Sequence, residues 1–127
     1  MRGGIVLLVV AAVMVYAYPA AHEFQQRMDC CGNLKLFYAG KAALEDLHCP
    51  RGGGYHAAIR PAIHVPFPTI IAFEPLSNHG GDGGAVLFSD GHAEFLMKGS
   101  YESRFRDDEA RIAAYLQSSG GTSLPRP

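Results

Sequence analysis

The N-terminal segment constrains this chain more than any other feature. Every residue from 5 to 18 is apolar or aromatic, and the stretch from 3 to 21 contains no charged side chain. As a helix, that stretch is just long enough to cross the hydrocarbon core of a bilayer. Arg2 stands before it and Tyr16 near its far end, where aromatic side chains favour the membrane interface. We therefore expect residues 1–21 to anchor the chain in a membrane, with Arg2 on the inner side.

Two other interpretations of residues 1–21 stay open. A short positive region, an apolar region and small residues near Ala21 would also suit a cleaved signal peptide. A buried core helix of a soluble protein is the third, and the lack of a polar face along the run disfavours it. The anchor and the signal peptide both export the rest of the chain. We therefore expect residues 22–119 to form a domain outside the cytoplasm.

Length and charge limit the remaining classes of function. A chain of 127 residues has room for one domain. Eleven Lys and Arg against twelve Asp and Glu give a net charge of -1, so no bulk charge attracts nucleic acid, and we expect no nucleic-acid partner. Fifteen Gly and eight Pro predict many loops. We expect residues 120–127 to be a disordered tail.

Hydrophobic periodicity predicts the main elements after the apolar run. Residues 20–41 show helical spacing of apolar side chains, so the first helix should continue past Pro19 with a bend there. Three prolines in residues 55–68 restrict that stretch to an edge or irregular strand. Residues 69–74 are β-branched and aromatic and predict a strand. Acidic residues at 107–109 predict the start of a short C-terminal helix.

Asp90-Gly91 between two apolar runs predicts a β-hairpin, because a two-residue type I′ turn needs positive φ at both central positions. Such a turn pairs Ser89 with His92 and places one set of apolar residues on a common face. That face should pack against the N-terminal helix. It comprises Val86, Phe88, Ala93 and Phe95.

Several short motifs resemble one protein family. Asn78-His79-Gly80-Gly81, a short strand and Asp90-Gly91-His92 are similar to the C-terminal signature of the prepilin-type processing-associated proteins, a His, nine residues and Asp-Gly-His. Residues 30–35 are similar to the Cys-x-x-Asn-Leu-Lys of the same family, and Cys49-Pro50 resembles its downstream Cys-Pro. The matches extend over residues 20–97.

The resemblance implies the architecture of a type IV pilin or a type II secretion pseudopilin. That architecture is an α+β fold, in which a long N-terminal helix, apolar at its start, packs on a small antiparallel sheet. The sequence also departs from the family pattern, because it keeps only Arg2-Gly3 of the usual Gly-Phe processing site and its apolar run is shorter than usual. Leu8 stands where family members have a Glu, and ten residues instead of nine separate His79 from Asp90.

The three cysteines allow one disulfide and one spare thiol, or three reduced thiols. The two family motifs that contain cysteine select Cys30 and Cys49 as the pair and leave Cys31 outside it. An exported domain would favour that disulfide, which would contribute on the order of 3 kcal/mol by constraining the unfolded chain.

The glycine-rich loop before the hairpin raises the question of a metal. His79, Asp82 and Asp90, with His92 nearby, could clamp a divalent cation. Carboxylates with loop carbonyls suit calcium, whereas two His and an Asp suit a transition metal. The structural alternative is that Asp90 and Gly91 serve the turn and that His79 only hydrogen-bonds the backbone, so that no cofactor is held.

We expect no catalytic residues and no enzyme activity, because the sequence has no nucleophile motif such as Gly-x-Ser-x-Gly. The first hypothesis is a single-pass, membrane-tethered pseudopilin-like protein of the bacterial cell membrane. Its periplasmic domain would have a structural or assembly role in a type II secretion or type IV pilus-like system, with the membrane and other pilin-like subunits as partners. The alternative is an exported binding module that holds a divalent metal or small ligand between His79 and His92. An exported metal-dependent hydrolase is the third and weakest hypothesis.

Overall fold

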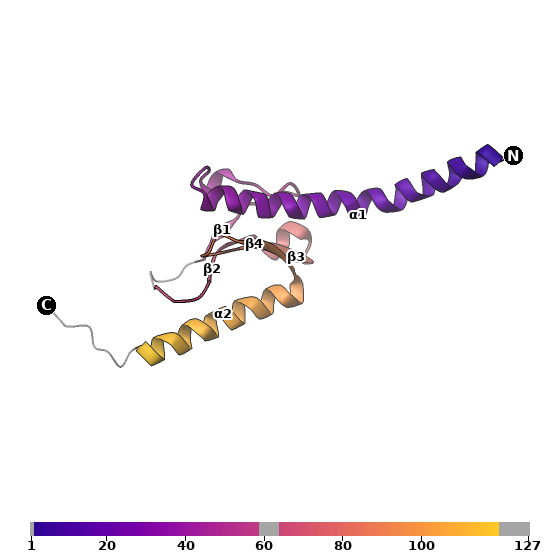
Figure 1. The fold of residues 1–127 in the computed structure, drawn as a ribbon. Coiled ribbons are helices and arrows are strands. Elements are labelled where there is room, and N and C mark those ends of the chain that lie inside the picture. The colour runs from indigo at the N-terminus through magenta and orange to yellow at the C-terminus, as the bar shows by residue number, and fades with distance from the viewer. Residues whose placement is uncertain (1, 59–63, 120–127) are drawn as a thin grey trace.

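The structure is a computed structural model that describes residues 2–58 and 64–119. It has the α+β architecture that the sequence predicts, with a long N-terminal helix, an antiparallel sheet and a C-terminal helix (Figure 1). The predicted disordered tail lies outside the described residues. In chain order the elements are α1 (Arg2–Tyr38), η1 (Leu44–Asp46), β1 (His56–Ala57), β2 (Ile70–Phe73), η2 (Leu76–His79), β3 (Gly83–Phe88), β4 (Ala93–Met97) and α2 (Lys98–Ser119), where η marks a 3₁₀-helix.

Helix α1 is continuous from the apolar run into the folded domain. It has 37 residues with Pro19 inside, and it curves gently along its length in Figure 1. Its first half projects beyond the sheet, and the large apolar side chains of residues 5–18 are all exposed there. Its second half contributes Cys30 and Leu34, four residues apart on one helix face and both fully buried. One helix therefore joins the candidate membrane segment to the protein core.

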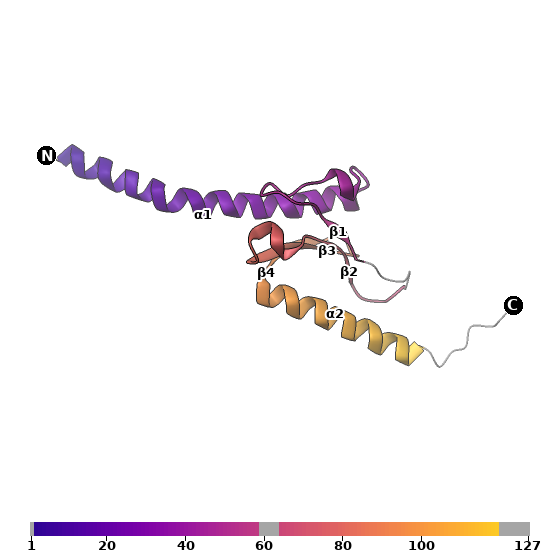
Figure 2. The same ribbon diagram turned by 180° about the vertical axis from the view of Figure 1, so that it is seen from behind.

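The four strands form one antiparallel sheet in the order β1-β2-β3-β4. Within its described residues, the proline-rich stretch supplies the two-residue edge strand β1, as predicted. Helix α1 packs on one face of the sheet and α2 on the other, and both views show these three layers (Figure 2). Because it is covered on both faces, the inner strand β3 is buried at every position.

The predicted hairpin forms, but its predicted register is wrong by one residue. Leu87 pairs with Ala93 and Val86 with Glu94. The loop has three residues instead of two, because the Gly91 N–H donates to the Phe88 carbonyl while the Phe88 N–H donates to the His92 carbonyl. Gly91 has a φ of 90°, and a type I turn followed by such a residue is the usual three-residue loop.

This register divides the predicted apolar face between two cores. Ala85 and Leu87 face α1, and the partly buried Phe95 packs with them. Val86 and Phe88 face the other way and pack with α2 residues such as Tyr101. The expectation that Val86 and Phe88 pack against the N-terminal helix is therefore wrong, although both are buried.

Helix α2 begins at Lys98, well before the acidic residues at which its start was predicted. Tyr101, Phe105 and Asp108 follow one another at helical spacing and pack against the sheet or hydrogen-bond to it. The Asp108 carboxylate accepts the Ile70 N–H at 3.0 Å, at the start of β2. This contact fixes α2 to the sheet through a backbone donor of β2.

Candidate metal centre

Four buried side chains of metal-binding type meet between α1 and the sheet. They are Cys30, Cys49, Glu74 and His79, and their sulfur, oxygen and nitrogen atoms all lie within 4.8 Å of one another. Residues 2–58 and 64–119 contain no other group of three or more such side chains. Each of the four comes from a different segment of the chain.

Tight local structure holds the first two residues. Cys30 lies on the buried face of α1. Cys49 is the first residue of a loop that two backbone hydrogen bonds close. The Cys49 N–H donates to the Gly53 carbonyl, and the Gly52 N–H donates to the Cys49 carbonyl. Gly52 and Gly53 have φ angles of 97° and 90°, which residues with a side chain rarely adopt. The loop therefore depends on these glycines to turn Cys49 toward α1.

Glu74 follows β2 directly and continues its pairing with β3 through its side chain. Its backbone N–H donates to the Ala85 carbonyl, and its Oε2 accepts the Ala85 N–H at 3.1 Å. Its Oε1 accepts from Asn78 Nδ2 at 3.3 Å and from the Cys30 thiol at 3.3 Å. The side chain is fully buried, which is rare for a carboxylate unless it is paired.

His79 ends the 3₁₀-helix η2, and Gly80 follows in the left-handed conformation. The buried ring lies nearly perpendicular to the ring of Phe95, with ring centroids 5.0 Å apart and planes at 80°. Its Nε2 lies 3.2 Å from Glu74 Oε1 and 3.5 and 3.4 Å from the sulfurs of Cys30 and Cys49. In the described part of the chain, its Nδ1 has no hydrogen-bond partner. The ring therefore directs one nitrogen at all three other residues.

The cysteine pairing predicted from the family motifs brings the right residues together, but as thiols. The sulfurs of Cys30 and Cys49 lie 3.4 Å apart and all three cysteines are free, whereas a disulfide bond is about 2.05 Å long. Burial raises the pKa of the Cys30 and Cys49 thiols. Reactive cysteines are partly exposed and have a lowered pKa, so these two thiols do not resemble nucleophiles.

Cys31 is buried outside the group of four, and burial raises its pKa from the usual 9.0 to about 11. The folded protein then keeps this proton at a pH where the unfolded chain loses it. We therefore expect the free energy of unfolding of the reduced, metal-free protein to fall between about pH 9 and pH 11. Cys31 should account for on the order of 2 kcal/mol of that fall.

Urea unfolding of the full chain in detergent, at several pH values with reductant and chelator, would measure this fall. Cys31→Ala has nothing to ionise at that position and should show a clearly shallower decline. Parallel pH profiles for the two proteins would contradict the role of Cys31.

Of the three metal ligands predicted from the sequence, the structure places only one in the group of four. His79 belongs to the group of four, but Asp82 and Asp90 do not, and both are exposed. Asp90 serves the hairpin instead, because its Oδ1 accepts the His92 N–H at 3.2 Å and lies 2.6 Å from His92 Nδ1. The hydrogen bond with the His92 side chain lowers the pKa of Asp90. Gly91 thus belongs to the turn, and His92 is the residue that closes it opposite Phe88.

Sequence reasoning missed Glu74 as a partner of His79 and treated Cys30 and Cys49 only as a disulfide. A signal for the carboxylate was present, because Glu74 follows the apolar strand β2 by one residue and lies five residues before His79. That spacing places both at the same end of the sheet.

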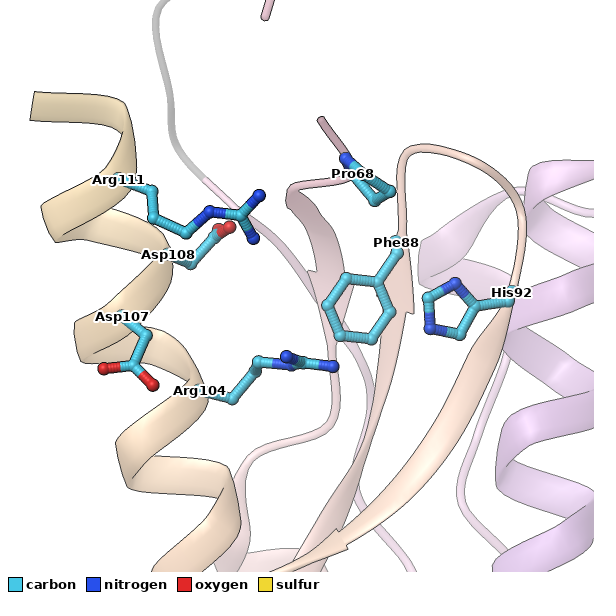
Figure 3. Close-up of a pocket in the computed structure, with 7 residues that line it drawn as sticks. All are labelled: Pro68, Phe88, His92, Arg104, Asp107, Asp108 and Arg111. Carbon is cyan, nitrogen blue, oxygen red and sulfur yellow. The ribbon is translucent and has the colours of Figure 1, made fainter. Parts of the chain in front are cut away.

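A small pocket lies on the other side of the sheet, between α2 and the hairpin (Figure 3). Its volume is about 120 Å³, below the roughly 300 Å³ at which typical ligand pockets begin. Arg104 and Arg111 enter it from α2, but each stacks on an aromatic ring, that of Phe88 or Phe67. We therefore assign no ligand to it. The lining is Pro68, Phe88, His92, Arg104, Asp107, Asp108 and Arg111.

The motifs that resemble the prepilin-type processing-associated proteins meet at the group of four. Cys30 belongs to the first motif, Cys49 to the second and His79 to the third. They therefore share one location in the fold, although up to 49 positions separate them in the chain. Comparison of the chain with family models, curated proteins and solved structures found no match.

Proposed function

We propose that this chain is a membrane-anchored, pilin-like subunit with a structural or assembly role in a type II secretion or type IV pilus-like system. The single observation that carries the proposal is helix α1, which is exposed and apolar in its first half and part of the domain core in its second half. The anchor would lie in the bacterial cell membrane and the domain on its periplasmic side.

The exposed half of α1 supports the anchor. It is long and apolar enough to cross a membrane. Its large side chains are exposed by between 51% at Val10 and 83% at Tyr16. A soluble monomer rarely presents a continuous apolar surface of that extent to water. Lipid, or the same helix of a neighbouring subunit, would cover it.

The folded half supports a structural role. The two thiols, the carboxylate and the histidine of the group of four lie in the core between α1 and the sheet, and each is at most 3% exposed, out of reach of a substrate in solution. The alternative function, a module that binds a divalent metal, has the group of four in its favour. However, that group is buried, so a metal held there would support the fold and would not be a cargo exchanged with solvent.

The test of the anchor is fractionation of cells that express the full chain. We expect the protein in the membrane fraction, resistant to alkaline carbonate and released by detergent, with an intact mass that includes residues 1–21. Protease added outside the inner membrane should degrade the domain. A soluble product that begins near Tyr18 or His22 would refute the anchor.

The test of assembly uses a photo-cross-linking amino acid at Val13, in the exposed half of α1. Adducts with a second copy or with another membrane subunit are expected. The matched control is the same amino acid at the exposed Lys98 of α2, which should give none of these adducts. If Val13 cross-links only to lipid, the anchor stands and the assembly role is wrong.

A further inference from the structure

We propose that Cys30, Cys49, Glu74 and His79 bind one zinc ion, which ties helix α1 to the sheet. This inference goes beyond the proposed function, because it concerns how the domain is held together in any role. It rests on the distances among the four side chains, on their chemistry and on their burial.

The distances approach those of a tetrahedral site. For ordinary zinc bond lengths, the edges would be about 3.8 Å between two sulfurs, about 3.6 Å from sulfur to nitrogen or oxygen, and about 3.4 Å from nitrogen to oxygen. The structure has 3.4 Å between the sulfurs, 3.5 and 3.4 Å from sulfur to nitrogen, 3.3 Å from Cys30 to Glu74, and 3.2 Å from His79 to Glu74. These five separations are about 0.1–0.4 Å below the tetrahedral values, and the sixth pair, Cys49 and Glu74, lies within 4.8 Å. Small adjustments of the side chains would admit the ion.

The donor atoms select the metal. Two sulfurs, one imidazole nitrogen and one carboxylate oxygen are zinc ligands, whereas calcium takes six to eight oxygens. The group therefore does not suit the calcium ion considered from the sequence. Four protein ligands also fill the tetrahedron and leave no position for water or substrate, which is typical of a structural site.

The surroundings suit an ion held by anionic ligands. The Arg51 backbone N–H donates to Cys49 Sγ at 3.4 Å, and the Ala85 N–H donates to Glu74 Oε2 at 3.1 Å. The Tyr55 hydroxyl, near the group, accepts from Asn33 Nδ2 at 3.1 Å. Such outer contacts orient metal ligands and stabilise their charge.

A disulfide between Cys30 and Cys49 is the competing arrangement, and the two exclude each other. The disulfide would use two of the four side chains and leave Glu74 and His79 as a separate buried pair, 3.2 Å apart. A zinc ion uses all four side chains, so the structure favours zinc.

The experiment uses the full chain in detergent, reduced and stripped of metal by a chelator and then kept free of oxygen. We would add zinc and measure the bound metal after desalting, and add cobalt and record the absorption spectrum. We expect one metal per chain, visible bands of tetrahedral cobalt and a thiolate-to-cobalt band in the near ultraviolet. Bound zinc should raise the midpoint of thermal unfolding by more than about 5 °C.

The variants identify the ligands. Cys49→Ser and His79→Gln should weaken zinc binding by more than about 100-fold, which is beyond the usual effect of changing an outer contact. Cys31→Ser is the matched control, because Cys31 is also buried but lies outside the group, and it should bind zinc normally. Asp82→Asn should also bind normally, which separates this site from the one predicted in the glycine-rich loop.

Three results would overturn the proposal. The first is no bound zinc in the reduced wild-type protein. The second is a cobalt spectrum without the thiolate band. This spectrum reports the ligands of the wild-type protein, so it remains informative even if a variant fails to fold. The third is an intact mass that lacks two hydrogens after isolation from cells, mapped to a Cys30–Cys49 disulfide.

Discussion

Truncation of Phe88 to alanine is expected to lower the free energy of unfolding by about 3–4 kcal/mol, through the lost burial of the ring and the cavity left behind. Phe88 is almost fully buried in the core between the sheet and α2. Its ring stacks on His92 at 4.3 Å, and the Arg104 guanidinium lies 5.1 Å from its centroid. Urea unfolding of the full chain in detergent would measure the loss.

The register of the hairpin makes this prediction specific. Phe88→Leu keeps most of the apolar volume and should cost less than about 1.5 kcal/mol. In double-mutant cycles Phe88 should couple to Arg104 on α2, by about 0.5–1 kcal/mol. It should not couple to Leu34, which lies in the core on the other side of the sheet. Coupling to Leu34 in place of Arg104 would mean that Phe88 faces α1.

Gly84→Ala is expected to destabilise the domain by about 2–3 kcal/mol, because the site in β3 has no room for a side chain. A Cβ built on Gly84 would lie 2.6 Å from the carbonyl oxygen of Glu74 and 3.1 Å from the ring of Tyr101. The carbonyl belongs to the residue whose side chain completes the group of four. Relief of the clash would therefore also displace Glu74.

Gly32→Ala is the matched control for this change, because a Cβ there meets nothing within 4 Å and the residue lies inside α1. Alanine is favoured over glycine in a helix by up to about 1 kcal/mol, so this variant should be more stable than the wild type. Thermal and urea unfolding of the two variants in detergent should give effects of opposite sign. Equal effects would contradict the tight packing of β3 against Glu74.

The sequence predicted the elements of this fold better than their pairing. Hydrophobic patterns located α1 and β2, and Asp90-Gly91 located the hairpin. The register was missed because Ala85, Val86, Leu87 and Phe88 are all apolar and all buried, so β3 has no alternation that tells one face from the other. Two-residue and three-residue loops both accept Asp-Gly, and only the hydrogen bonds of Phe88 distinguish them.

The start of α2 was missed for a local reason. Gly99 reads as a break, yet it lies within the first turn of the helix, where a Cβ would meet nothing within 4 Å. The spacing of Tyr101, Phe105 and Asp108 is the better indicator. It predicts a helix that packs one face on the sheet.

The group of four could not have been assembled from the sequence. Cys30 and Cys49 were visible as a pair and His79 as a motif residue, but each was assigned to a different task. Glu74 completes the group, and only the pairing of β2 with β3 and the loop that follows Cys49 bring it within reach of the sulfurs. Apart from the short spacing between Glu74 and His79, these contacts are set by the tertiary structure.

If residues 1–21 cross a bilayer as proposed, the continuity of α1 sets how far the domain stands from it. An α-helix rises about 1.5 Å per residue, so the nine steps from Ala21 to Cys30 span about 13 Å. That is about twice the thickness of one headgroup layer, which is roughly 5–7.5 Å. Because α1 is one continuous helix through these residues, a tilt or rotation of the helix at Ala21 would turn the buried sulfurs and the sheet with it. The domain would then move as a lever on its anchor, with Pro19 as the position where a proline can bend the helix.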